Sequence, residues 1–590
     1  MRDKRRIRLV ALVGALTLLA AACGGDDGGG GGTGDDSSGQ SSDKPTKGGR
    51  MRWISEGDTD YVDPTATYYT VGISMHRGVS RQLTNYPNSE NPDEQIQPVP
   101  DLATDLGKPN GDFTQWEYTL KDGVKWGPAL GGEDVPGVTG EAITCDDVKY
   151  GIERQFIPSV GAQYNYYYPI EGAAEFSDGS ADDVSGLKCA DDKTLQITLS
   201  EPLPDLDFRL AMPAASPVPK SYAQKFDKKK DSDYDLHVVA TGPYYISDYT
   251  PGESMKLDRN EHWDPATDDI REAYVDGVDW KMGFENDVAV QKLIDNDYDM
   301  SAGDVGALGP QLEQVVTDPE LQSRFINESN DCTYYAFLNT TVEPFDNPEV
   351  RQAVNFAIDR ANLVKLRGGK TSGPVASSTL PPGVAGYLPT DEFNPFETPG
   401  MSGDIEKAKQ MMADAGYPDG YHEPLLMVGA SGPPHEQINE SIRQDLTKLG
   451  IDNFEIKLPE SPNHFSQFYG IPAKNVGIGT GAGWCKDWSD ATTYLDPLFN
   501  GANILQSGNS NYSEIDDPEL NKAIEKANDT PPGPERVAAW EEANRLATES
   551  GAWVPFQWSF EKIVLSERMV GAFFHASFTN IDWVNTGIAE

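Results

Sequence analysis

Short alternating apolar patterns mark the first half of the chain. Residues 116–120 alternate between apolar and polar positions, as a strand with one buried face does. Similar patterns recur at residues 194–199 and 242–258. Between them, a threonine and an aspartate three residues apart have the spacing that caps a helix, and they predict a helix over residues 144–152. The N-terminal half is therefore predicted to be rich in strands.

Helical spacing dominates the second half. The apolar positions of residues 348–368 recur every three or four residues, with proline at the start and glycine at the end, and they predict one long helix. Two more helical stripes occupy residues 405–415 and 438–449. Near the C-terminus, residues 554–558 return to an aromatic strand pattern. We expect a mixed α/β fold in which the stripes face the core.

The N-terminus has the pattern of a targeting segment. A basic start is followed by 14 apolar or small residues at positions 9–22, a run too short to span a bilayer as a helix. This pattern predicts a signal peptide over residues 1–22. The next residue, Cys23, completes a sequence that resembles the bacterial lipobox and predicts a lipidated N-terminus; an ordinary signal peptide is the alternative. Residues 23–49, rich in Gly, Ser and Asp, are expected to form a flexible tether.

Composition narrows the possible partners. The chain has 590 residues, with 94 acidic against 48 basic side chains and a net charge of −46. So acidic a chain repels polyphosphates and anionic lipid surfaces, which argues against a nucleic-acid partner. No second apolar run is long enough to span a membrane, so we expect the body outside the cell, attached to the membrane through the N-terminal lipid alone.

Four cysteines follow Cys23, an even number in an exported chain, and none has the close spacing of a zinc or redox site. Two disulfides are the simplest interpretation, with free thiols as the alternative. Proximity in sequence predicts that Cys145 pairs with Cys189 and that Cys332 pairs with Cys485.

Several short segments resemble catalytic or cofactor motifs but lack the flanking residues or elements that those motifs require. Residues 477–482 imitate a dinucleotide-binding loop, but no helix pattern follows them. Residues 369–371 imitate the end of a P-loop without its earlier glycine, and residues 295–299 lack the glycine of a calcium loop. The seven histidines have no metal-ligand spacing. We therefore expect a binding protein without cofactor or metal, not an enzyme.

Several segments, in order, resemble the extracytoplasmic solute-binding proteins of peptide ABC transporters, the oligopeptide- and dipeptide-binding family 5. They are residues 62–64, 100–103, 118–126, 144–154, 241–244, 257–260, 338–339, 344–345, 350–360 and 413–417. The resemblance implies a two-lobed periplasmic-binding-protein fold of type II, with an extra subdomain inserted in the N-terminal lobe. The implied boundaries are 50–330 for lobe I with an insertion at about 95–225, 331–554 for lobe II, and 555–590 for a return to lobe I.

The segment at residues 483–488 resembles the strand beside which a bound peptide lies in the oligopeptide-binding members. The resemblance implies that Asp487 takes the α-ammonium of the peptide while the strand backbone pairs with the ligand. It also aligns Cys332 and Cys485 with a cysteine pair of the family. The other expected contacts are Gly483, Trp484, Cys485, Lys486, Tyr69, Thr70, Val71, Tyr164, Tyr166 and Tyr167, although the tyrosine run at 164–167 is equally consistent with core.

One position departs from the family. Where some members have a basic residue for the peptide carboxylate, this chain has Gly481, and Arg367 and Lys370 are the remaining basic candidates. We expect a monomeric receptor that delivers oligopeptides or dipeptides to ABC permease subunits and, through them, to cytoplasmic ATPases. A receptor for an oligosaccharide or a nickel complex is the alternative, and a secreted hydrolase is a weaker one.

Overall fold

The computed structural model describes residues 44–161, 164–460 and 463–589. The predicted signal peptide, the predicted lipidation site Cys23 and the predicted tether up to residue 43 lie outside the described residues. Within the described ranges, no helix is long and apolar enough to cross a membrane.

The first lobe is built on a five-stranded sheet. Its strand order is β11 (Met300–Ser301), β1 (Arg50–Ile54), β10 (Gly277–Lys281), β9 (Ser254–Arg259) and β8 (Tyr244–Thr250). β1 runs parallel to β10 and β11, whereas β8, β9 and β10 are antiparallel. The C-terminal segment packs into this core: the ring of Trp583 lies edge-on to that of Trp53, 5.0 Å between centroids. The end of the chain thus completes the lobe in which the described chain begins.

A second sheet carries its own apolar core. It is four-stranded, in the order β4 (Lys108–Pro109), β5 (Gln115–Thr119), β7 (Thr194–Thr198) and β6 (Leu187–Asp191). Helix α3 (Cys145–Glu153) packs on it, and Thr144 and Asp147 form the capping box at its start. The disulfide between Cys145 and Cys189 joins this helix to β6. Strand, helix and disulfide therefore form one unit within the first lobe.

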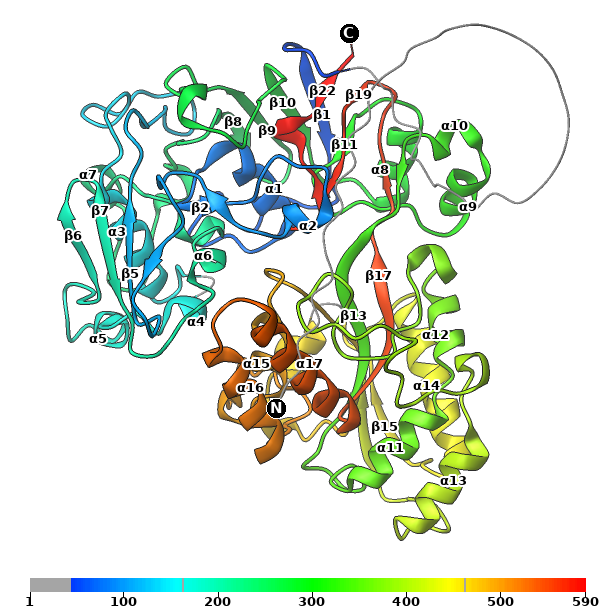
Figure 1. The fold of residues 1–590 in the computed structure, drawn as a ribbon. Helices are drawn as coiled ribbons and strands as arrows, with labels where there is room; N and C mark the ends of the chain where they lie inside the picture. The colour runs from blue at the N-terminus through cyan, green and yellow to red at the C-terminus, as the bar shows by residue number, and fades with distance from the viewer. Residues whose placement is uncertain (1–43, 162–163, 461–462, 590) are drawn as a thin grey trace, which may run out of the picture. The chain divides into compact units, whose positions relative to one another are not determined.

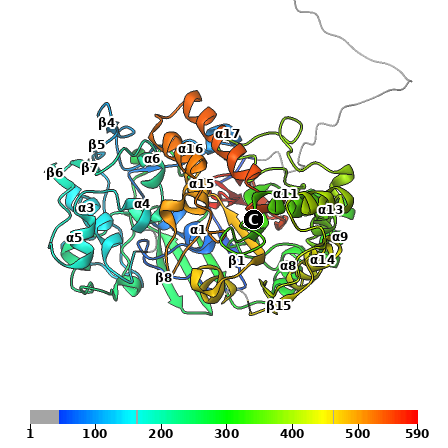
Figure 2. The same cartoon turned by 90° about the horizontal axis from the view of Figure 1, so that it is seen from below.

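The second lobe surrounds a five-stranded sheet. Its strand order is β15 (Phe454–Lys457), β14 (Leu425–Val428), β16 (Ile478–Cys485), β13 (Ser329–Leu338) and β17 (Trp553–Phe560). Figures 1 and 2 show one helical layer on each face of this sheet. One layer contains α15 (Thr492–Phe499), α16 (Pro518–Asp529) and α17 (Pro534–Glu549); the other contains α11 (Pro348–Ala357), α12 (Arg360–Leu366), α13 (Ile405–Asp414) and α14 (His435–Leu449).

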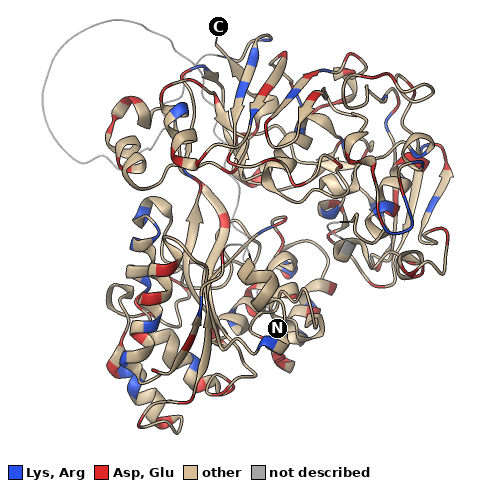
Figure 3. Ribbon diagram, turned by 180° about the vertical axis from the view of Figure 1, so that it is seen from behind, with Lys and Arg blue, Asp and Glu red and all other residues tan. Residues whose placement is uncertain are grey.

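Two neighbouring strands connect the lobes. Figure 1 shows β13 and β17 running between the two groups of elements. They are antiparallel partners in the second-lobe sheet, and the short strands that precede and follow them, β12 (Phe325–Ile326) and β18 (Ile563–Val564), also pair. Lys, Arg, Asp and Glu positions are distributed over many elements of both lobes (Figure 3).

Shorter elements complete the described fold. The remaining helices are α1 (Thr70–Val79), α2 (Pro92–Gln95), α4 (Tyr164–Tyr167), α5 (Ala173–Asp178), α6 (Leu206–Arg209), α7 (Lys220–Ala223), α8 (Asn286–Ile294), α9 (Gly309–Thr317) and α10 (Pro319–Gln322). The remaining strands are β2 (Thr84–Asn85), β3 (Val99–Pro100), β19 (Met569–Val570), β20 (Phe574–His575), β21 (Asn580–Ile581) and β22 (Gly587–Ile588).

Most predicted elements are confirmed, and one is wrong. The strand patterns at 116–120 and 194–199 are β5 and β7, and the helical stripes at 405–415 and 438–449 are α13 and α14. The single long helix predicted over 348–368 is two helices, α11 and α12. The helix breaks because Ile358 is extended, and the Asp359 carboxylate then caps α12 by accepting from the backbone N–H of Asn362, 2.9 Å away.

Candidate functional site

Strand β16 leaves part of one edge without a strand partner. On one side it pairs with β13 along most of its length, from Ile478 to Cys485. On the other side β14 reaches only Ile478 and Gly479. Beyond those two residues, no strand of the described chain pairs with this edge, and residues 482–485 form its outer end. An edge of this kind can accept an added strand, because its backbone N–H and C=O groups are available for pairing.

Asp487 lies just past this open edge and receives two hydroxyl groups from the first lobe. Tyr68 donates its hydroxyl to one carboxylate oxygen at 2.7 Å, and Tyr166 donates to the other. No described Lys, Arg or His forms an ion pair with Asp487. Burial raises the pKa of this carboxyl above its ordinary value of 3.8, while the two tyrosine hydroxyls act in the opposite direction. The carboxylate of Asp487 therefore has no cationic partner among the described residues.

Local contacts fix both tyrosines. The backbone N–H of Tyr68 donates to Asp60 at 2.6 Å, which orients the segment just before α1. The ring of Tyr166 lies edge-on to Trp488, 4.9 Å between centroids, and its carbonyl accepts from Arg209 at 2.8 Å. The chain therefore holds Asp487 between residues of the first lobe and of the inserted sheet unit.

One face of the open edge carries a cation. Tyr334 on β13 lies opposite Gly483, and a Cβ at Gly483 would meet the Tyr334 ring at 2.8 Å, so glycine leaves room for this ring. The guanidinium of Arg367, at the end of α12, lies 3.4 Å from the centroid of the same ring. Its Nε donates to Gln557 at 2.8 Å. No described carboxylate forms an ion pair with Arg367.

Two histidines near Gly481 were missed by the sequence reasoning. Nδ1 of His435 would lie 3.5 Å from a Cβ at Gly481, and this nitrogen is buried without a hydrogen-bond partner in the described structure. The ring of His464 lies 4.0 Å from that of Phe465, between centroids. Burial lowers the pKa of both rings. The positive charge of Arg367 lowers the pKa of His435 further, and His435 in turn contributes to lowering that of His464 to about 4. Both rings are therefore neutral at neutral pH. Residues 435 and 464 are far apart in sequence, so no spacing pattern joins them.

The opposite face of the edge is aromatic. Ala482 belongs to an apolar core with Tyr335, and Trp484, Phe465 and Tyr512 pack against that core. Trp484 donates its indole N–H inward to Thr493 at 2.8 Å, so its polar atom is satisfied within the protein. The two faces of this edge therefore differ in chemistry.

The structure gives internal partners to several predicted contacts. Tyr167 is buried and donates to the carbonyl of Arg209 at 2.6 Å, and Val71 belongs to the core of the first lobe. Lys486 is buried in an ion pair with Asp331. We therefore leave these three side chains out of the proposed contact set.

Other predicted residues lie at the start of α1, at the start of α4, in a short 3-10 turn or within strand β16. Tyr69 and Thr70 are exposed at the start of α1, Tyr164 is the first residue of α4, and Lys370 is exposed in the short 3-10 turn Gly369–Ser372. Cys485 is disulfide-bonded to Cys332, which ties the end of β16 to β13.

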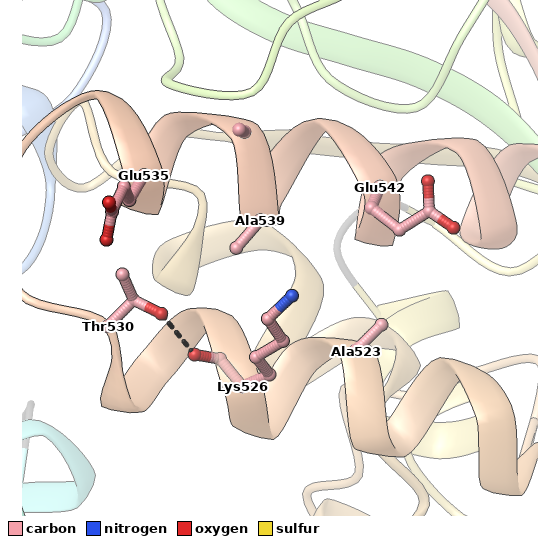
Figure 4. A pocket seen from close by; sticks show the side chains of 7 residues that line it. Ala523, Lys526, Thr530, Glu535, Ala539 and Glu542 are labelled. Atoms are coloured by element: carbon pink, nitrogen blue, oxygen red, sulfur yellow. Dashed lines mark hydrogen bonds between the residues drawn. The ribbon is translucent and has the colours of Figure 1, made fainter.

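A separate cavity lies between α16 and α17. Its volume is about 350 Å³, and Figure 4 shows its lining side chains on these two helices. They are Ala523, Lys526, Thr530, Glu535, Ala538, Ala539 and Glu542. None of the residues around Asp487 or along β16 lines it, so it is not part of the site described above.

Two lobes joined by paired strands, with an open strand edge and a carboxylate where they meet, define a two-lobed α/β binding protein. A family model described as "Bacterial extracellular solute-binding proteins, family 5 Middle" matches residues 97–506. The chain belongs to this family, whose members are substrate-binding proteins of ABC importers and not enzymes.

Individual relatives agree with this assignment. The chain is 26% identical to heme-binding protein A of Haemophilus influenzae over 450 residues, covering 73% of this chain and 74% of the relative. It is 23% identical to the periplasmic oligopeptide-binding protein OppA of Salmonella typhimurium over 457 residues, 76% and 77% of the two chains. A solved structure titled "Clavulanic acid biosynthesis oligopeptide binding protein 2" superposes with a TM-score of 0.84 at 27% identity, over 92% of this chain and 96% of that one.

Proposed function

We propose that this protein is the lipid-anchored receptor of an ABC importer, and that it captures oligopeptides or dipeptides and delivers them to the permease. The observation that carries the proposal is that an open strand edge, residues 482–485, lies next to the carboxylate of Asp487, which has no ion-pair partner among the described residues. A free peptide supplies the matching groups, an extended backbone and an α-ammonium.

Physical chemistry supports both halves of this recognition. Main-chain pairing with an added strand is indifferent to side chains, so it gives affinity for many peptides. The ammonium would replace solvent at a carboxylate that burial already destabilises, and charge-assisted hydrogen bonds are roughly twice as strong as neutral ones. Asp487 would thereby fix which end of the peptide lies at this end of the strand.

Ligand capture is proposed to close the lobes. Asp487 belongs to the second lobe, whereas Tyr68 and Tyr166 belong to the first, so the ligand ammonium would contact a group that both lobes share. A ligand that binds the closed state more tightly shifts the equilibrium toward it. The closed, loaded form is the one we expect the permease to accept.

The proposal extends to the contacts, the boundaries and the anchor. The proposed contact residues are Asp487, Gly483, Trp484, Cys485, Tyr69, Thr70, Tyr164, Tyr166, Arg367 and Lys370. We place the lobes at residues 50–330, with an insertion at about 95–225, at 331–554, and at 555–590 for the return. Cys23 is the proposed lipid attachment site.

The decisive experiment is to identify the ligand that the protein carries from its native cells. Protein purified without denaturation is heated, and the released material is analysed by mass spectrometry. We expect peptides with free N-termini, in near-stoichiometric amount. An oligosaccharide or a metal complex in place of peptide would refute the peptide assignment.

The anchor is tested separately. Cells fed an alkyne fatty acid should label the wild-type protein and not a Cys23→Ala variant, which should be released into the soluble fraction. Equal labelling of the two proteins would refute lipidation at Cys23.

A further inference from the structure

The open edge of β16 presents two chemically different faces to any strand that is added to it. Gly483 shares one face with Tyr334, and Arg367 covers that ring. Ala482 and Trp484 face the opposite side, toward the aromatic core that contains Tyr335. Side chains of an added strand alternate between these faces, because successive residues of a strand point in opposite directions.

The Arg367 face has an excess of positive charge. Besides its bond to Gln557, Arg367 has guanidinium N–H groups with no protein acceptor in the described chain, and it is half-buried. Lys562 lies close enough for Arg367 to lower its pKa, and Glu561 offsets this charge in part. His435 adds a neutral ring with an unpartnered nitrogen. A carboxylate is the group that complements a free guanidinium and a neutral imidazole N–H.

The opposite face offers no such charge. Trp484 is half-buried, with its one polar atom bonded inward, and Phe465 and Tyr512 are half-buried beside the same core. Tyr335 has a hydroxyl without a partner, but it is buried within this core. A carboxylate beside Trp484 would therefore lose water without gaining an ion pair, which costs free energy, whereas an aromatic or aliphatic side chain would gain contact area.

We propose that this protein selects its peptides by side-chain parity: the residue beside Gly483 carries a carboxylate that binds Arg367 and His435, and its two neighbours are apolar or aromatic. The inference rests on the proposed function, because it needs an extended peptide along β16. It goes beyond sequence-independent capture, since it assigns a chemical preference to alternate positions of the ligand.

A positional scan tests the proposal on the intact protein. Pentaalanine and four variants, each with one glutamate at position 2, 3, 4 or 5, are titrated calorimetrically, in one series with free C-termini and in a second series with C-terminal amides. The peptide with glutamate at one particular position should bind about tenfold to a hundredfold more tightly than pentaalanine in both series, which is the range expected for one charge-assisted hydrogen bond. The peptides with glutamate at the adjacent positions should bind no more tightly than pentaalanine. A parallel phenylalanine scan should show the complementary pattern.

Variants connect the preference to the named residues. Arg367→Gln should remove the gain at the favoured position. Arg545→Gln, which removes a guanidinium stacked on Phe393 away from β16, should retain it. The wild-type scan needs no variant, so poor folding of Arg367→Gln would leave the proposal testable.

Three results would overturn the inference. A glutamate effect that is the same at every position would show that parity is not read. A gain that survives Arg367→Gln would assign it to another residue. A gain that disappears in the amide series would mean that the terminal carboxylate, and not a side chain, lies at Arg367. Failure of the proposed function looks different, since then no peptide of either series binds the wild-type protein.

Discussion

Replacing Asp487 by asparagine should separate recognition of the ligand ammonium from recognition of its backbone. The substitution keeps the size of the side chain but removes the negative charge. Its one carbonyl oxygen can accept from either Tyr68 or Tyr166, and the other hydroxyl faces the amide NH2, from which it can accept. A charge-assisted hydrogen bond contributes about 1.5 to 3 kcal/mol. We therefore expect about tenfold to more than a hundredfold weaker binding of a peptide with a free N-terminus.

The matching assay is a double comparison by calorimetry, with wild type and Asp487→Asn each titrated with one peptide in its free and N-acetylated forms. The acetylated peptide has no ammonium, so the substitution should change its affinity little. Asp452→Asn, which alters a surface carboxylate bonded to His422, is the control and should change neither affinity. If Asp487→Asn weakens both peptides equally, Asp487 does not bind the ammonium.

The pH dependence follows from the raised pKa of Asp487. The ammonium binds the ionised carboxylate, so wild-type affinity for the free peptide should fall as the pH decreases through this raised pKa. The acetylated peptide and the asparagine variant should not show that dependence. The same shift means that ionisation of Asp487 is less favourable in the folded than in the unfolded protein, so the ligand-free variant should melt at a higher temperature than wild type near pH 7. The difference should shrink at low pH, where the wild-type carboxyl is protonated.

Two further predictions concern the supports of the site and the fold. Gly483→Ala should weaken binding of pentaalanine severalfold by calorimetry, because its Cβ would lie 2.8 Å from the Tyr334 ring. Gly481→Ala meets its nearest atom, Nδ1 of His435, only at 3.5 Å, and should bind this peptide, which has no side-chain carboxylate for His435, like wild type. Equal effects of the two substitutions would contradict the assignment of the ring. Asp101→Asn should lower the free energy of urea unfolding at pH 7 by about 3 to 5 kcal/mol. It removes the carboxylate that pairs with two fully buried guanidinium groups, Arg81 at 2.7 Å and Arg271 at 2.8 Å, and leaves them only Asp268. A change below about 1 kcal/mol would contradict this.

Local patterns predicted the elements well wherever the signal extends over one or two helical turns. The capping box at Thr144 and the apolar stripes of α13 and α14 act over one or two turns, so they are visible in sequence. The break between α11 and α12 was hidden because the apolar spacing continues across it. Only the extended conformation of Ile358, followed by a new cap at Asp359, separates the two helices.

The site was predictable only where one segment carries it. The resemblance at residues 483–488 points to Asp487, whose role stays a prediction. It led us to expect a contact from Tyr69, whereas the tyrosine that donates to Asp487 in the structure is its neighbour, Tyr68. Which of these two tyrosines points at Asp487 depends on the turn held by Asp60, which accepts from the backbone of both. Side-chain direction at such a turn is a property of folded geometry, and no periodicity encodes it.

Gly481 shows that a cation expected at one position of a strand can be supplied by a residue of another element. The basic group that the family resemblance leads us to expect at this position is absent, yet Arg367 reaches the same strand from the end of α12, across the ring of Tyr334. That approach needs glycine at 483, because a side chain there would displace the ring. The glycine and the arginine are therefore parts of one arrangement, separated by more than a hundred residues in the sequence. A residue-by-residue comparison of sequences therefore shows only that the positive charge at position 481 is absent, whereas the fold brings a cation to the same strand from α12.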